Sequence, residues 1–396
     1  MIDVAIAGGG PAGLSLAILL AQAGAEVRVL ERRGSAAEGS RAIGLHPPGL
    51  DVLDAAGVGD AAVAAGVRIR GGRAVARNRT VAGLDFGVLG GAHPYVLALP
   101  QAVTVRLLED RLAEIAPGAL RRGVSVRGAE GSPRGDGVAV RLDGHGGGAE
   151  PPAGLLRARY LVGADGTRSA VRDTGGFAAS GRGYPDRYLM GDFADDSGFG
   201  PTAVLFLHER GIVECFPLPG GVRRWVVRLG RRDDPGPSGG AGAGDGARTD
   251  PRWLTEEILR RTGRRVDPAG NSMLSWFATR RRTVETMAAG RTVLIGDAAH
   301  EVSPIGGQGM TLGLADAAEL AGLLLADREP TEAELAAFSR RRLAAARSAG
   351  RQAHVNMALG RPLPGPLLHG RNALIRQALR SRPLADGIAH RFAMRA

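Results

Sequence analysis

The sequence contains a single cysteine and no long apolar run, and both scarcities limit where the protein can work. Cys215 cannot form an internal disulfide, so a disulfide-stabilised secreted fold is not expected. The two most apolar helical stretches, 12–25 and 312–326, are too short to span a bilayer, and the second carries Asp316 and Glu319. The N-terminus enters an apolar strand without the basic region of a signal peptide. We therefore expect a cytoplasmic protein without a membrane span.

Lysine is absent, so all 51 basic residues are arginine. A net charge of +11 and a pI near 11.1 would ordinarily suggest a nucleic-acid partner. Here the arginines are spread along the chain and accompany abundant alanine and glycine, a bias typical of a GC-rich coding genome. No nucleic-acid partner is expected.

Other absences concern catalysis. The eight histidines show no metal-ligand spacing, and no GxSxG nucleophile motif occurs, so neither a metal centre nor a serine hydrolase is expected. A chain of 396 residues with 44% hydrophobic and 23% charged residues is typical of a globular protein of two or three domains.

The N-terminal segment holds the strongest positive signal. Residues 2–7 are strand-like, a GxGxxG motif follows at once, and residues 14–23 are helix formers. This context predicts a dinucleotide site in which the backbone approaches a pyrophosphate at a helix N-terminus. The residues expected to contact that pyrophosphate are Gly8, Gly10, Pro11, Ala12 and Gly13.

A second strand over 27–30 closes on Glu31, which lies 31 − 10 = 21 positions after Gly10. This carboxylate is placed to accept hydrogen bonds from both ribose hydroxyls and would repel a 2′-phosphate, so the site should hold FAD or NAD and not NADP. Arg32 is a further candidate contact. The plain alternative is that Glu31 is a surface acid at a strand end.

Residues 184–230 show the clearest antiparallel pattern, with four strand candidates joined by turn residues. They predict a sheet that floors an apolar pocket. Alternate residues should form the substrate wall, and the candidates are Met190, Leu205, Cys215 and Trp225. A register error of one residue would exchange the two faces, and Cys215 taken alone is typical of a core residue.

Two more turns follow predicted strands. Asp165 lies in an Asp-Gly turn after the strand 155–162, and Asp297 follows the strand 292–295. Together with the glycine motif, they resemble the three signature motifs of the FAD-dependent aromatic hydroxylases, the group A flavin monooxygenases typified by para-hydroxybenzoate hydroxylase. The resemblance covers roughly residues 1–330. The length of the chain leaves no room for a thioredoxin-like C-terminal domain, which suggests the short polyketide-hydroxylase type.

The resemblance implies roles for individual residues. Asp165 would help to position FAD and the nicotinamide cofactor, and Asp297 would accept a ribityl hydroxyl. Arg41 would lie between flavin and substrate, with Pro304 over the flavin edge. The other implied cofactor contacts are Gln101, Arg106, Gly307, Gly309 and Met310. Family members usually carry Asn where this chain has Thr311.

Structural alternatives exist for several of these residues. Asp165 could be a turn former and helix cap, and Asp297 could cap the loop that follows it. His46 and His300 are more typical of hydrogen-bonding struts than of catalytic bases. Cofactor and structural roles can coexist at Asp165.

The expected fold class is α/β: a discontinuous Rossmann-like FAD-binding domain, an inserted and mostly antiparallel β-sheet substrate domain, and a helical C-terminal tail. The expected FAD-binding domain comprises residues 1–70, 98–180 and 275–330. The substrate domain comprises 71–97 and 181–274, and 331–396 form the C-terminal segment.

The implied activity is hydroxylation of a phenolic or polycyclic polyketide-like aromatic substrate, as in antibiotic biosynthesis. FAD would be reduced by transiently bound NADH or NADPH, and O2 would add to give a flavin C4a-hydroperoxide. A monomer or a homodimer is expected. Two alternatives stay open: a flavin-dependent reductase of carbon–carbon double bonds, similar to geranylgeranyl reductases, and a non-catalytic flavin-binding protein.

Overall fold

The computed structural model describes residues 1–35, 42–131, 135–144, 153–230 and 250–395, and the chain divides into two compact units. The first unit comprises Met1–Ala62, Pro100–Arg182 and Arg280–Arg351. The second comprises Val63–Leu99, Gly183–Thr279 and Gln352–Ala396. The predicted C-terminal helical tail is present, and its residues divide between the two units after Arg351.

The first unit is built on a mixed sheet in the order β17-β18-β11-β1-β2-β8, extended by β10 and β9. The strands of this sheet are β1 (Ile2–Ala7), β2 (Val27–Glu31), β8 (Leu120–Arg122), β9 (Val124–Gly131), β10 (Val138–Gly144), β11 (Ala153–Gly163), β17 (Ala288–Ala289) and β18 (Thr292–Leu294). The first unit also contains the short strands β3 (Gly44–Leu45) and β19 (His300–Glu301), which pair with other sheets. The parallel register aligns Ala7 with Gly163 and Gly163 with Leu294. The carboxyl ends of β1, β11 and β18 therefore meet at one edge, and this brings the three predicted motifs together.

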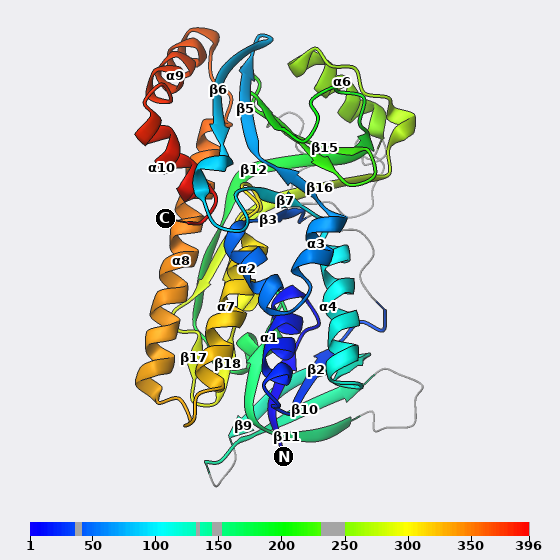
Figure 1. Ribbon diagram of the computed structural model, residues 1–396, viewed down its shortest axis with the longest axis vertical. Coiled ribbons are helices and arrows are strands. Elements are labelled where there is room, and N and C mark those ends of the chain that lie inside the picture. Colours follow the sequence, from blue (N-terminus) through cyan, green and yellow to red (C-terminus); the bar gives the residue numbers. More distant parts are fainter. Residues whose placement is uncertain (36–41, 132–134, 145–152, 231–249, 396) are drawn as a thin grey trace. The chain divides into compact units, whose positions relative to one another are not determined.

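Several helices lie wholly or partly in the first unit. They are α1 (Pro11–Gln22), α2 (Pro47–Ala55), α3 (Gly59–Ala65), α4 (Gln101–Ile115), α5 (Ala170–Thr174), α7 (Gly309–Leu324) and α8 (Glu332–Leu359), with the 3-10 turn η4 (Gly296–Ala298). The sequence predicted no helix at α3. The buried residues of α1 include Leu14, Leu16, Ile18 and Leu20, so this helix needs cover on several sides. Figure 1 shows it between α4 and α7, against which it packs.

The second unit contains a sheet in the order β16-β12-β15-β14-β13-β5-β6. The strands that contribute to this unit are β4 (Val67–Ile69), β5 (Gly71–Ala76), β6 (Arg79–Asp85), β7 (Val96–Ala98), β12 (Ala179–Ala194), β13 (Ala203–Phe206), β14 (Val213–Leu218), β15 (Val222–Arg228) and β16 (Met273–Val284). The four strands predicted within 184–230 are all present as β12 to β15, and their mutual pairings are antiparallel.

Within its described residues, the second unit also contains the helices α6 (Pro251–Thr262), α9 (Gly365–Ala378) and α10 (Arg382–Phe392) and the 3-10 turns η1 (Phe86–Leu89) and η3 (Pro268–Gly270). The residues that flank α6 mark its two ends. Asp250 caps it by accepting a hydrogen bond from the Arg252 N–H at 2.8 Å, and Gly263 ends it with a φ of 71°.

One face of the sheet packs against α6. Leu254 and Ile258 of this helix share a buried apolar cluster with Val204, Cys215 and Trp225 of the strands. Within the described residues, no helix is both long and apolar enough to cross a bilayer.

Candidate functional site

The turn between β1 and α1 is built by its glycines. Gly8 has a φ of +107°, and a Cβ there would lie 2.3 Å from the Ala164 carbonyl oxygen. A Cβ at Gly13 would lie 2.1 Å from the Gly8 carbonyl oxygen, whereas a Cβ at Gly10 would meet no protein atom within 4 Å. No side chain caps α1, which starts at Pro11. Two glycines are therefore required by the fold, and the third faces open space at a helix N-terminus, where N–H groups favour an anion.

Glu31 lies beside this turn. Its side chain is buried, and its carboxylate accepts hydrogen bonds from the N–H groups of Gly9 at 2.8 Å and Arg33 at 2.9 Å. Because a carboxylate has about four lone-pair sites, it can still accept the ribose hydroxyls that the sequence predicts. Arg32 is exposed, and its contact with a cofactor stays a prediction.

Asp165 combines its two predicted roles. One carboxylate oxygen accepts hydrogen bonds from the N–H groups of Ala170 at 2.7 Å and Val171 at 3.2 Å, and so caps α5. The other oxygen is buried and has no hydrogen-bond partner within the described part of the chain. Burial raises the pKa of this carboxyl despite these hydrogen bonds. An unsatisfied buried acceptor is costly, so this oxygen fits a donor supplied by a ligand. Arg168 is exposed.

The turn that carries Asp297 packs against α1. Gly296 has a φ of +60°, and a Cβ there would lie 3.5 Å from the Ala12 Cβ. A Cβ at Gly313 would lie 3.3 Å from the same atom. Burial raises the pKa of Asp297 to about 6, an effect that His300 opposes, and yet the side chain is exposed to solvent. The carboxylate is surrounded by protein but can be reached by a ligand. The open turn, the unsatisfied Asp165 oxygen and this carboxylate fit a bound dinucleotide.

The loop before α7 is held by His46. Its imidazole donates a hydrogen bond from Nε2 to the Gly306 carbonyl oxygen at 2.9 Å, and its backbone N–H donates to Thr311 Oγ1 at 3.1 Å. Burial lowers the pKa of His46 to about 4, so the ring is neutral at physiological pH. A Cβ at Gly44 would lie 3.5 Å from the Gly307 Cα. These contacts give His46 a structural role and tie Thr311 to the N-terminus of α2.

Asp316 was not predicted as a site residue, and it organises the turn before Asp297. It is fully buried in α7, accepts a hydrogen bond from the Gly296 N–H at 2.8 Å and lies 2.6 Å from His300 Nε2. Its second oxygen accepts a hydrogen bond from Arg342 Nε at 2.6 Å. Burial opposes both charges, but the pairing lowers the pKa of Asp316 and raises that of His300. An acid inside a helix that is otherwise highly apolar was the signal in the sequence.

The remaining predicted cofactor residues lie in α4, in the loop before α7 and in the first turn of α7, apart from Arg41. Gln101 begins α4 and donates its backbone N–H to the Ala42 carbonyl oxygen at 3.1 Å. Arg106 is exposed and lies about 140° further around this helix, so the two side chains leave it in different directions. Pro304 is exposed in the loop that precedes α7, and Arg41 lies outside the described residues. Gly309 and Met310 form the first turn of α7, which no side chain caps.

The four predicted wall residues do not share one face, which corrects that expectation. Val204, Cys215 and Trp225 lie opposite one another in the apolar cluster under α6. Met190 and Leu205 have the other parity and lie on the opposite face of the sheet. Burial raises the pKa of the Cys215 thiol to about 12. Cys215 and Trp225 are therefore core residues, and substrate contacts of Met190 and Leu205 stay predictions.

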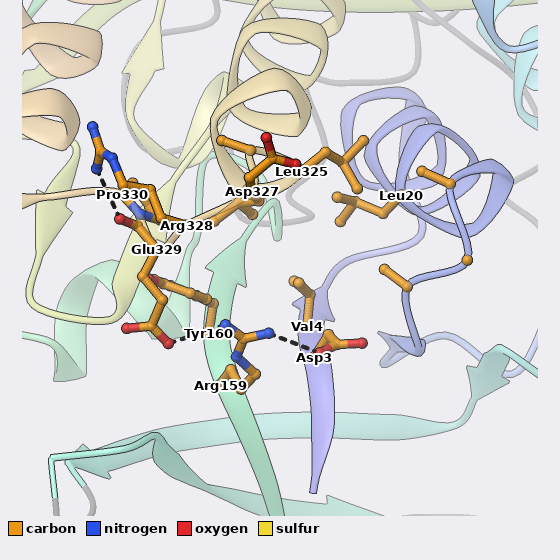
Figure 2. A pocket seen from close by; sticks show the side chains of 15 residues that line it. Asp3, Val4, Leu20, Arg159, Tyr160, Leu325, Asp327, Arg328, Glu329 and Pro330 are labelled. Atoms are coloured by element: carbon orange, nitrogen blue, oxygen red, sulfur yellow. Dashed lines mark hydrogen bonds and ion pairs between the residues drawn. The ribbon is translucent and has the colours of Figure 1, made fainter.

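A separate hollow of about 300 Å³ lies in the first unit, and Figure 2 shows its lining. Arg159 contacts Asp3 at 3.3 Å and Glu329 at 3.0 Å there (Figure 2). Asp3 lies near the amino-terminal end of β1, and Arg159 is level with it on β11, away from the edge where the three motifs meet. We therefore place the functional site at the carboxyl edge and not in this hollow.

Comparisons with known proteins agree with this geometry. A sequence profile described as FAD binding domain matches residues 1–353. The chain is 33% identical over 324 residues to 6-methylpretetramide 4-monooxygenase of Streptomyces rimosus, covering 81% of this chain and spanning 55% of that relative's length. The structure of the OxyS anhydrotetracycline hydroxylase from Streptomyces rimosus matches with a TM-score of 0.78 at 30% identity, covering 99% of this chain and 76% of that one. The p-nitrophenol 4-monooxygenase PnpA of Pseudomonas putida, at 23% identity, has the same fold, with a TM-score of 0.86 over 100% of this chain and 98% of the other.

Proposed function

The chain belongs to the FAD binding domain family, and we propose that it is an FAD-dependent monooxygenase that hydroxylates an aromatic substrate, with NADH or NADPH as reductant and O2 as co-substrate. The observation that carries the proposal is the meeting of three separated turns at the first turn of α1. Each turn brings a group that suits one part of FAD. The monooxygenase relatives supply the reaction class.

The residues of this chain would divide the work of holding FAD. The open N-terminus of α1 would bind the pyrophosphate, and Glu31 would accept the ribose hydroxyls of the adenosine half. Asp165 would accept a donor at its unsatisfied oxygen, and Asp297 would accept a ribityl hydroxyl. The uncapped N-terminus of α7 would stabilise negative charge on the ring. Bound FAD would supply the electron transfer and the activation of dioxygen.

We propose a phenolic or polycyclic polyketide-like substrate, such as those of antibiotic biosynthesis. Relatives named for 6-methylpretetramide and anhydrotetracycline support this class. We further propose that Arg41, Gln101, Arg106 and Pro304 keep the cofactor and active-site roles that the sequence suggests. A cytoplasmic location and a monomeric or homodimeric state complete the proposal, and the fully buried Cys215 thiol is consistent with that location.

Incubation with isotopically labelled dioxygen tests the reaction class. Phenolic and polycyclic aromatic compounds would first be screened for stimulated NADH or NADPH oxidation by the FAD-loaded protein. We expect one labelled oxygen atom in the product of an active compound. An unlabelled, reduced product would instead identify a double-bond reductase, and a complete lack of stimulation would favour a non-catalytic flavin protein.

Asp297→Ala is expected to lose most of its bound flavin. The change removes an acceptor of a charge-assisted hydrogen bond, an interaction of about 1.5–3 kcal/mol, which is roughly 10- to 150-fold in the FAD dissociation constant. Because the side chain is exposed, the fold should survive. The flavin absorbance of purified protein and FAD titration measure the effect. Asp327→Ala, an exposed acid just after α7, is the matched control. Full flavin occupancy in Asp297→Ala would show that this carboxylate does not bind FAD.

A further inference from the structure

Strand β14 carries a buried acid without a partner. Glu214 is 7% exposed, and none of the described residues donates a hydrogen bond to its carboxylate or forms an ion pair with it. The other buried acids of the described chain all accept hydrogen bonds: Glu31, Asp186, Asp192, Glu257 and Asp316. In a chain with 51 arginines, an unpaired buried acid has no evident structural purpose.

Tyr188 of β12 is a second buried group without a partner. It is 1% exposed, its ring stacks on Phe277 with centroids 5.4 Å apart, and its hydroxyl has no hydrogen-bond partner in the described chain. The nearby charges are already satisfied, because Asp186 accepts hydrogen bonds from Arg228 and Arg361. Burial raises the pKa of Tyr188, and the charge of Glu214 raises it further. Tyr188 is therefore a buried hydroxyl without a hydrogen-bond partner in the described chain.

Both side chains lie on the face of the sheet that is turned away from α6. Glu214 is opposite Leu205 on one side and Val226 on the other, and Val226 is opposite Met190. Tyr188 has the same parity as Met190 on β12, which pairs with β15 (Figure 1). The neighbours of Glu214 on this face are thus apolar, whereas Arg228, which pairs with Asp186, lies opposite Tyr188. A few polar groups in an apolar surface are typical of a site that orients a small molecule.

We propose that Glu214 and Tyr188 bind the hydroxyl group of a phenolic substrate, with Glu214 as the base that takes its proton. This inference rests on the proposed function and identifies the substrate class of that site. The substrate O–H bond breaks, a new O–H bond forms on the Glu214 carboxylate, and the electron pair stays on the phenolic oxygen. Tyr188 then donates a hydrogen bond to this oxygen. No oxidant is needed for the step, and the ring becomes richer in electrons before hydroxylation.

The protonation of Glu214 suits this role. Burial raises its pKa to about 7, so both forms exist near neutral pH, as a general base requires. The raised value also means that the folded state binds the proton more tightly than the unfolded state. The folded protein therefore loses stability as pH rises from the ordinary value of 4.5 through about 7. Asp186, Arg228 and Arg361 are the other charged groups near Tyr188, and their charges also act on this site as the pH changes.

Binding by the FAD-loaded protein tests the proposal. Calorimetric titration would compare 2-naphthol with 2-methoxynaphthalene, which keeps the ring and the oxygen but lacks the acidic proton. We expect the wild-type protein to bind 2-naphthol at least about tenfold more tightly, as a hydrogen bond to a charged group predicts. Glu214→Gln should abolish this preference and Tyr188→Phe should weaken it. Glu209→Gln, which makes the same charge change at an exposed position, should retain it.

Thermal unfolding gives an independent readout. Glu214→Gln should raise the midpoint by roughly 5 °C at pH 8 and leave it unchanged near pH 4.5, because the variant removes a buried charge only where that charge exists. Unchanged FAD content would show that the variant is folded. Equal affinity of the wild-type protein for the two probes, or a full preference in Glu214→Gln, would overturn the proposal. Labelled-oxygen incorporation without such a preference would refute this inference alone, and the preference without incorporation would refute only the monooxygenase activity.

Discussion

A Gly10→Val variant is expected to fold and to lose its FAD. Gly10 has the extended conformation of φ −85° and ψ 177°, which any residue adopts, and a Cβ there meets no protein atom within 4 Å. The space that the valine enters is the space that we assign to the pyrophosphate. Overpacking typically costs about 1–3 kcal/mol, which corresponds to roughly 5- to 150-fold in FAD affinity. Flavin absorbance and FAD titration measure the loss, and circular dichroism checks the fold.

Gly322→Val is the matched control for Gly10→Val. Gly322 lies in α7, and a Cβ there also meets no atom within 4 Å, so this variant should keep its flavin. Gly13 would not serve, because a Cβ at that position collides with the Gly8 carbonyl oxygen at 2.1 Å and would disturb the fold itself. Wild-type FAD affinity in Gly10→Val would mean that the pyrophosphate does not approach this turn.

Asp316→Ala is expected to destabilise the protein by about 3–5 kcal/mol, the usual cost of removing one partner of a buried ion pair. The change leaves His300 without its carboxylate partner, removes one acceptor from Arg342 and leaves the Gly296 N–H without its acceptor. Because this N–H bond holds the turn that carries Asp297, FAD affinity should fall as well. Chemical denaturation with and without FAD measures both effects.

The pH dependence of this loss has a defined sign. The lowered pKa of Asp316 stabilises the folded state above the ordinary value of 3.8, and the raised pKa of His300 stabilises it below the ordinary value of 6.5. The difference between wild type and Asp316→Ala should therefore be largest between these pH values and shrink as pH rises through the raised pKa of His300.

Glu319→Ala is the matched control for Asp316→Ala. It removes an acid from the same helix, but the ion pairs of Glu319 with Arg341 at 2.7 Å and with Arg342 at 3.7 Å are partly exposed to solvent. Their loss should cost less than about 1 kcal/mol. An equally small and pH-independent effect of Asp316→Ala would contradict the role of the buried network.

Several elements were predictable because their signals are local. The helix α6 starts with Asp250 and Pro251 and ends at Gly263, and these residues mark its bounds without help from the rest of the fold. The strand, turn and helix around Gly10 likewise lie within a few residues of one another. The sequence carries no such boundary signal at Arg351, where the first unit ends, because α8 continues through this position as one helix.

The faces of the β12–β15 sheet were not predictable in the same way. Alternation shows that neighbouring residues point to opposite faces, but it does not show which face a helix covers. As a result, Cys215 and Trp225 were placed with Met190, although the structure puts them under α6. Glu214 was missed because a charged residue in a strand is ordinarily on the surface.

Residue order and spacing alone predicted the dinucleotide site, its glycine turn and the acid that we propose binds the ribose, because each of these motifs is a short segment whose chemistry depends on adjacent residues. Only the folded chain showed that Asp316 holds the turn of Asp297, and that Glu214 and Tyr188 share one face of a sheet. These relations join residues distant in sequence. They depend on strand register and helix packing, which cooperative burial of the whole core selects and which no local pattern encodes.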